Sequence, residues 1–200
     1  FRAVLEWYGV HISKKICRKY LLKLNCDFFE VFDKRLALML SNTNPHFGQA
    51  RPLMPNSVQI GFSHVEPPKE LPNGDLKEFL DASSNGVILM SFGSTENMKI
   101  MRKKTLQKFL NVFEKLPYEI LLKFEGDDED MKIPKNVKLS KWLPFSDVLA
   151  HQNVKLAILH GGILSAFEAV DREVPMIIFP LAYDQPSNAR LIESKGIGLC

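Results

Sequence analysis

The spacing of apolar and polar positions changes along the chain, predicting helices first and strands later. Residues 1–41 mix Leu and Phe with Lys and Arg and hold no Gly or Pro after Gly9, which favours helices, above all through residues 12–35. "LALMLSN", at 36–42, predicts a short buried strand. "VQIGF", at 58–62, predicts another strand after a proline-rich loop.

A stiff connector is predicted between residues 61 and 74. Its sequence "SHVEPPKELPNG" holds three prolines and few apolar residues, which is typical of a spacer rather than of the interior of a helix or strand. We therefore expect a domain boundary here, dividing the chain into residues 1–60, the connector 61–74 and residues 75–200.

Beyond Asn85 the pattern becomes a regular alternation of strands and helices. Continuous apolar runs predict strands at 86–94, 118–126, 137–142, 154–160 and 175–181, and amphipathic spacing predicts helices at 97–116, 164–172 and 187–195. Such alternation indicates the doubly wound α/β class, a parallel sheet covered on both faces. Ligands of these sheets collect outside the carboxyl ends of the strands.

Composition narrows the function classes. With 46% apolar and 24% charged residues among 200, the chain has the composition of a globular protein. A net charge of +3 with dispersed basic residues argues against a nucleic-acid partner. The three cysteines lack CxxC spacing and support neither a zinc site nor a closed disulfide framework. No metal constellation, dinucleotide glycine motif or P-loop occurs in the sequence.

The sequence gives no sign of a membrane span. Its longest apolar candidate, "VPMIIFPLAY", contains two prolines and falls short of the roughly 18 apolar residues that a span needs. The chain opens without Met and stops where a new apolar run has just begun. We therefore expect a fragment of a longer protein.

Two small-residue turns end predicted strands. In "SFGST", at 91–95, Gly93 permits close approach of a ligand, and Ser94 offers a hydroxyl near a helix start that favours anions. The alternative is a plain turn with a helix cap. One such turn is weak support by itself.

The second turn, His160-Gly161-Gly162, directly precedes a predicted helix. Backbone N–H groups, the imidazole and the Ser165 hydroxyl could together hold a pyrophosphate, and Glu168 could accept hydrogen bonds from ribose hydroxyls. An equally weighted alternative is that Ser165 and Glu168 form a capping box with no ligand involved.

Further polar and aromatic candidates follow other predicted strands. Asp184 and Gln185 could contact the hydroxyls of a sugar, or Asp184 could cap a helix with Pro186 in its first turn. Trp142 could stack on a base or fill the core. Lys123 could neutralise phosphate or simply lie in solvent.

In combination these segments resemble the UDP-glycosyltransferase family, which includes the animal UDP-glucuronosyltransferases. The resemblance is carried by "SFGS", "KWLPFSDVLAH", "LHGGILSAFEA", "VPMIIFPLAYDQPSNA" and the connector "GFSHVEPPKELP", which most resembles arthropod members. It covers the chain from Leu36 to its last residue. A match in several ordered parts over so long a span is far more specific than any single turn.

The resemblance implies a GT-B architecture of two Rossmann-like domains, with residues 1–60 as the tail of the acceptor domain and 75–200 as an incomplete donor domain. By resemblance, Trp142 stacks on the base, Glu168 binds the ribose, and Asp184 and Gln185 contact the sugar. The positions that match diphosphate contacts are Ser94, His160, Gly162 and Ser165. A UDP-sugar is thus expected as co-substrate, with no cofactor.

Two positions depart from the family pattern. Lys123 stands where relatives that make glucuronides often have Arg, which weakens the inference of a glucuronate donor. Phe145 replaces the usual Gln of the Trp-Leu-Pro-Gln motif, and a phenyl ring cannot replace the hydrogen bonds of an amide. Donor affinity or donor choice is therefore in question.

The implied activity is transfer of a hexosyl group from a UDP-sugar to a small lipophilic acceptor, with inversion and with the catalytic base upstream of this fragment. One alternative is a catalytically impaired binding or partner subunit of the same fold, and another is a sugar-nucleotide epimerase. The resemblance further implies a role in detoxification and a location on the lumenal side of the endoplasmic reticulum membrane. It is also compatible with a membrane anchor outside this fragment and with assembly into a homo-oligomer.

Overall fold

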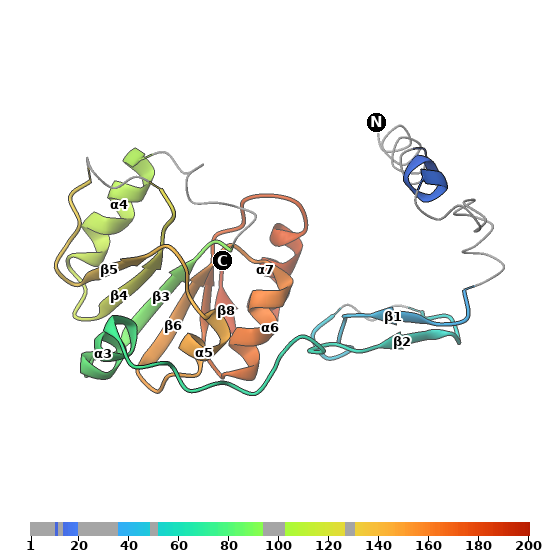
Figure 1. Cartoon of the computed structure of the whole chain (residues 1–200), viewed down its shortest axis with the longest axis horizontal. Helices are drawn as coiled ribbons and strands as arrows, with labels where there is room; N and C mark the ends of the chain where they lie inside the picture. The colour runs from blue at the N-terminus through green and yellow to red at the C-terminus, as the bar shows by residue number, and fades with distance from the viewer. Residues whose placement is uncertain (1–10, 12–13, 20–35, 49–51, 94–102, 127–130) are drawn as a thin grey trace. The chain divides into compact units, whose positions relative to one another are not determined.

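In a computed structural model, the chain forms two compact units (Figure 1). The described residues are 11, 14–19, 36–48, 52–93, 103–126 and 131–200. One unit comprises residues 1–43 and 50–61, and the other comprises 44–49 and 62–200. The predicted domain boundaries remain a prediction.

The smaller unit holds a pair of parallel strands. β1 (Met39–Ser41) pairs with β2 (Ser57–Gln59), so both short strands predicted from sequence are confirmed. The prediction that the first strand is buried is wrong, because Leu40, in the middle of β1, is 56% exposed. Among the described residues, β1 and β2 form a sheet of only two strands. Of the helix predicted over 12–35, residues 14–19 are helical and the rest lies outside the described residues.

The larger unit is built on a six-stranded parallel sheet with the order β5-β4-β3-β6-β7-β8. The strands are β3 (Val87–Ser91), β4 (Glu119–Lys123), β5 (Val137–Ser140), β6 (Val154–Leu159), β7 (Met176–Ile178) and β8 (Gly198–Leu199). The chain runs outward from β3 to β5 and then returns to β6 on the other side of β3. In open α/β sheets ligands bind at such a switch point, which here lies beyond the carboxyl ends of β3 and β6.

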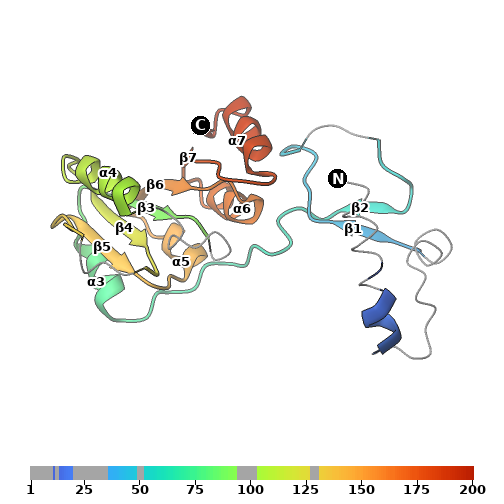
Figure 2. The ribbon, with the colours of Figure 1, turned by 90° about the horizontal axis from the view of Figure 1, so that it is seen from above.

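Apolar cores lie on both faces of this sheet because successive side chains of a strand point to opposite faces. Leu89 faces the core built with α3 (Asp75–Ala82), α5 (Phe145–Leu149), α6 (Ile163–Asp171) and α7 (Gln185–Ser194). Met90 faces the core built with α4 (Lys103–Phe113). Figure 2 shows α4 and α3 on opposite sides of the strands. The predicted doubly wound α/β class is confirmed.

Three elements of this unit were not predicted. α3 follows the connector and buries Leu80 completely, while Lys77 and Asp81 pair at 2.7 Å on its outer surface. α5 has only five residues, too few to show a helical period. β8 has two residues and lies in the apolar run at the end of the chain.

The connector carries no helix or strand between residues 62 and 74, yet it packs on the larger unit. Leu71 is 8% exposed, and the ring of Phe62 stacks on Phe167 of α6 with centroids 4.4 Å apart. Phe47, from the short segment 44–49, meets Phe167 edge-on at 5.0 Å. These rings explain why both segments belong to the six-stranded unit.

Candidate functional site

The two glycine turns meet at the switch point, with the imidazole of His160 between them. A Cβ atom placed on Gly93 would lie 2.9 Å from Cε1 of His160, and one on Gly162 would lie 2.7 Å from its Nε2. Side chains at either position would collide with the ring. The turns after β3 and β6 are therefore shaped to admit this histidine at the mouth of the sheet.

Lys123, at the end of β4, extends toward the same turn. Its Nζ donates to the Gly93 carbonyl at 3.0 Å and pairs with Glu125 at 2.7 Å, and its side chain is 13% exposed. The solvated-lysine alternative is therefore wrong. The ion pair with Glu125 already compensates this positive charge, so a phosphate contact by Lys123 remains a prediction.

The α6 helix starts at Ile163, immediately after Gly162. The capping-box alternative is wrong, because Gly162 occupies the cap position without a side-chain bond and Ser165 already lies in the first turn. The N–H groups of that turn have no partner within the helix, and they form the positive end of its dipole. Ser94, the remaining predicted diphosphate contact, lies outside the described residues.

The turn between β7 and α7 lies against Gly161. A Cβ atom on Gly161, whose φ is +92°, would come within 2.9 Å of Ile178 Cγ2 and 3.2 Å of the Gln185 carbonyl oxygen. Nδ2 of Asn188 donates both to the Gly161 carbonyl at 2.9 Å and to Asp184 Oδ2 at 2.8 Å. Asn188 thus ties the predicted sugar-binding turn to the predicted phosphate-binding turn. Sequence reasoning missed this role, although Asp184 and Asn188 lie one helical turn apart.

The predicted sugar-contacting pair is held differently at its two positions. Asp184 is exposed and precedes α7 without capping it through its side chain, whereas Pro186 lies in the first turn as expected. Gln185 is 4% exposed, and its Oε1 accepts hydrogen bonds from the N–H groups of Leu181 at 2.7 Å and Ala182 at 2.9 Å. In this structure the Gln185 oxygen therefore orders its own loop.

A pocket of about 330 Å³ brings Trp142, Phe145 and Glu168 together. Trp142 is 71% exposed, so the alternative that it fills the core is wrong. Phe145 starts α5, and its ring is partly buried against the core around Leu89. The phenyl ring that replaces the family's amide therefore contributes to packing as well as to the pocket.

Glu168 is half-buried on α6 in this pocket. Burial raises the pKa of its carboxyl above the ordinary value, and the positive charges of His64 and Arg172 act in the opposite direction. His64 comes from the connector, which also supplies Glu66 and Lys69 to the pocket lining. No sequence motif pointed to these connector residues as part of the site.

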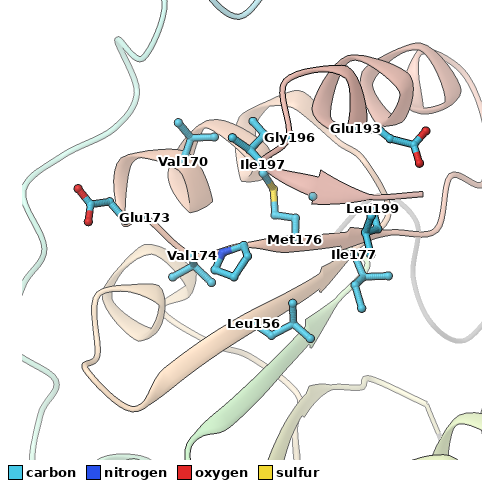
Figure 3. Close-up of a pocket in the computed structure, with 12 residues that line it drawn as sticks. Leu156, Val170, Glu173, Val174, Met176, Ile177, Glu193, Gly196, Ile197 and Leu199 are labelled. Atoms are coloured by element: carbon cyan, nitrogen blue, oxygen red, sulfur yellow. The ribbon is translucent and has the colours of Figure 1, made fainter.

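A second, larger pocket of about 670 Å³ lies elsewhere in the unit (Figure 3). It is lined by Leu156, Val170, Glu173, Val174, Pro175, Met176, Ile177, Glu193, Gly196, Ile197, Gly198 and Leu199. Its lining is apolar apart from two carboxylates and includes the first residues of β7 and β8. A nucleoside diphosphate requires hydrogen-bond donors and positive charge, so this pocket suits that ligand poorly despite its size.

In the described part of the chain, no group of three or more His, Cys, Asp or Glu side chains is placed to hold a metal ion. None of the described helices combines the length and apolar character that a bilayer span requires.

The glycine turns at the switch point, the start of α6 and the aromatic and acidic pocket are an arrangement typical of nucleotide-binding α/β domains. The chain belongs to the family described as UDP-glucoronosyl and UDP-glucosyl transferase, whose model matches residues 7–200. The family assignment made from the sequence motifs is confirmed.

Among curated relatives, UDP-glucosyltransferase 2 of Dactylopius coccus is 38% identical over 188 residues, covering 94% of this chain and 36% of the relative. An ecdysteroid UDP-glucosyltransferase of Spodoptera littoralis nuclear polyhedrosis virus is 37% identical over 171 residues, covering 82% and 33%. The chain thus spans about a third of the length of these relatives.

Among solved structures, a variant of Os79 from O. sativa in complex with UDP matches with a TM-score of 0.61 and 21% identity. The match covers 72% of this chain and 36% of that one. The fold is that of the GT-B glycosyltransferases, and this chain holds part of it.

Proposed function

We propose that this chain forms the donor half of a UDP-glycosyltransferase, which transfers a hexosyl group from a UDP-sugar to a small lipophilic acceptor with inversion. The main support for the proposal is the pocket lined by both Trp142 and Glu168. Glu168 belongs to α6, the helix whose start adjoins His160 and Gly162. The family and the relatives support the transfer of a sugar from a UDP-sugar.

In this proposal each part of the donor meets a group suited to its chemistry. The exposed Trp142 indole stacks on uracil, and Glu168 accepts hydrogen bonds from the ribose hydroxyls. The diphosphate lies at the start of α6, where backbone N–H groups and the helix dipole favour negative charge. Gln185 packs against Gly161 of the turn after β6, and Asp184 is linked to that turn through Asn188. Both residues contact the sugar in this proposal.

The chemical step is a direct displacement at the anomeric carbon. A base outside this chain removes the proton of an acceptor hydroxyl, the hydroxyl oxygen bonds to the anomeric carbon, and the bond to the UDP oxygen breaks. Negative charge then grows on the departing diphosphate. Preorganised donors at the start of α6, with His160 beside them, stabilise that charge.

Calorimetric titration of UDP into the 200-residue chain tests this proposal. Glu168→Gln should weaken UDP binding about tenfold or more, because hydrogen bonds to a charged acceptor are worth about 1.5–3 kcal/mol. Glu193→Gln is the matched control, since Glu193 is an exposed helical carboxylate beside the larger apolar pocket. No UDP binding by the wild type, or equal losses in both variants, would contradict the proposal.

A second candidate is a catalytically impaired binding or partner subunit. The observation that favours it is Phe145, whose ring packs on the core and offers no hydrogen bond to a nucleotide. A wild-type chain that binds UDP only at millimolar concentration, with binding tightened at least tenfold by Phe145→Gln, would support this candidate. Tight binding by the wild type would exclude an eroded donor site.

The cellular setting is a further part of the proposal. It places the protein on the lumenal side of the endoplasmic reticulum membrane, held by an anchor outside this chain, with a role in detoxification. Protease protection of the protein in intact microsomes, lost when detergent opens them, is the expected result. Digestion in intact microsomes would contradict the lumenal placement.

A further inference from the structure

The connector, residues 62–74, forms part of the pocket that holds Trp142 and Glu168. Its residues His64, Glu66 and Lys69 line this pocket together with the segment that follows β5. A segment expected to act only as a spacer therefore contributes side chains to the candidate nucleotide site.

The connector is fixed to α6 by aromatic and polar contacts. Phe62 adopts a left-handed backbone conformation, with φ of +67°, that is uncommon for an aromatic residue. Its ring stacks on Phe167 at 4.4 Å, and Nε2 of His64 donates a hydrogen bond to the Leu164 carbonyl at 3.1 Å. These contacts attach the connector to the helix that carries Glu168.

Two further bonds secure the following residues of the connector. Nη2 of Arg172, at the end of α6, donates to the Glu66 carbonyl at 2.5 Å. The Lys69 N–H donates to Asp147 Oδ1 of α5 at 2.8 Å. This side of the pocket is therefore held at both α5 and α6.

His64 is the connector residue most closely linked to Glu168. The His64 ring lies against the Phe167 ring, with centroids 6.0 Å apart. Phe167 directly precedes Glu168 in the sequence of α6. A positive charge on the His64 ring lowers the pKa of the Glu168 carboxyl. The other charged groups around this pair are Glu66 and Lys69 of the connector, together with Asp147 and Arg172.

We propose that the connector is one wall of the nucleotide pocket and that His64 is a positioning residue for UDP, tying this wall to the first turn of α6 beside Glu168. The inference rests on the proposed function. The residue acts through Glu168: with the connector attached, the carboxylate is held where the ribose hydroxyls reach it.

Two substitutions separate the contacts of His64. His64→Gln keeps an N–H donor that can reach the Leu164 carbonyl, whereas His64→Phe keeps a ring against Phe167 but loses that donor. His46→Gln is the control, because His46 is an exposed histidine outside the pocket lining. Each chain is titrated with UDP and with 2′,3′-dideoxyuridine diphosphate, which lacks the ribose hydroxyls, and thermal unfolding is followed in parallel.

His64→Phe should raise the Kd for UDP about three- to tenfold, the equivalent of losing one positioned hydrogen bond. The same substitution should change the Kd for the dideoxy nucleotide less than about twofold, because Glu168 then has no hydroxyl to hold. His64→Gln should recover most of the affinity for UDP. The His46→Gln control should bind both nucleotides as the wild type does.

An unchanged Kd for UDP in His64→Phe, or an equal loss for both nucleotides, would overturn the inference while leaving the proposed function intact. A lowered unfolding temperature with an unchanged Kd would assign His64 a purely structural role and would also overturn it. A wild-type chain that binds neither nucleotide would overturn the inference together with the proposed function.

Discussion

At the scale of single residues, the mouth of the sheet is organised around one imidazole ring. His160 occupies space that two missing side chains leave open, at Gly93 and at Gly162. The sequence pattern suggested that these glycines let a ligand approach. The structure adds that they first admit a histidine, so the glycines and the ring form one packing unit.

Substituting the glycines tests this packing unit. Gly162→Ala should destabilise the fold by about 1–3 kcal/mol, because its new methyl group overlaps the His160 ring. The backbone at Gly162 has φ of −62°, which alanine adopts without strain, so His160→Ala should relieve most of this cost in the double variant. Chemical denaturation of the four chains in this cycle measures the coupling.

Gly93→Ala is the matched control for that cycle. At φ of +76° an alanine is strained whatever its surroundings, so removing the His160 ring should relieve only part of the cost. Equal relief at both glycines, or none at Gly162, would show that the ring does not set the requirement for glycine.

Glu168 predicts a pH dependence of stability. Its folded-state pKa is raised mainly by burial, so its contribution to stability is fully present below the unfolded-state pKa and is lost as pH rises through the folded value. Glu168→Gln removes this titration. The free energy of unfolding of the variant should therefore increase relative to that of the wild type as the pH rises through and above the ordinary pKa of a glutamate. The same variant should bind UDP less well.

Denaturant unfolding of both chains between pH 4 and roughly pH 8 checks this dependence, a range that brackets the ordinary glutamate pKa on both sides. A difference in stability that stays constant across the range, or that reverses in sign, would contradict the raised pKa.

At the scale of elements, the first turn of α7 is bound to the turn after β6. Asn188 donates to both Gly161 and Asp184, so a single side chain sets the distance between the candidate phosphate and sugar regions. The strands and helices themselves follow from the alternation of apolar runs and amphipathic segments. The hydrogen bond from Asn188 to Gly161 cannot be predicted from these patterns, because it joins positions 27 residues apart in sequence.

Removing the Asn188 amide should loosen this junction. Asn188→Ala should lower the free energy of unfolding by about 1 kcal/mol, since it leaves the Gly161 carbonyl without this donor. Arg190→Ala, at an exposed position on the same helix, should change stability by less than about 0.5 kcal/mol. Equal effects of the two substitutions in denaturant unfolding would show that the Asn188 bonds carry no net stability.

The missed elements show where sequence patterns are strong and weak. α3 carries Leu76, Phe79 and Leu80 at helical spacing, so it could have been predicted from the same rule that gave α4 and α6. α5 could not, because five residues do not complete two helical turns. Short elements of this kind form only where the rest of the domain provides a surface for them.

At the scale of the whole molecule, the site is assembled from segments distant in sequence. The family motifs pointed to Trp142 and His160, which follow β5 and β6, and to Glu168, which lies one turn into the helix that begins at Ile163. The connector was missed: its prolines predict a spacer, and nothing in their spacing shows that His64 would line a pocket beside Glu168. Pocket walls made by irregular segments depend on tertiary packing, which residue periodicity does not encode.

The most direct measurement is a crystal structure of this chain grown with UDP. We predict uracil against the Trp142 indole, ribose hydroxyls on the Glu168 carboxylate and the diphosphate at the first turn of α6 beside His160. Density for UDP in the apolar pocket around Met176, or ordered UDP anywhere that leaves both Trp142 and Glu168 without contact, would contradict it.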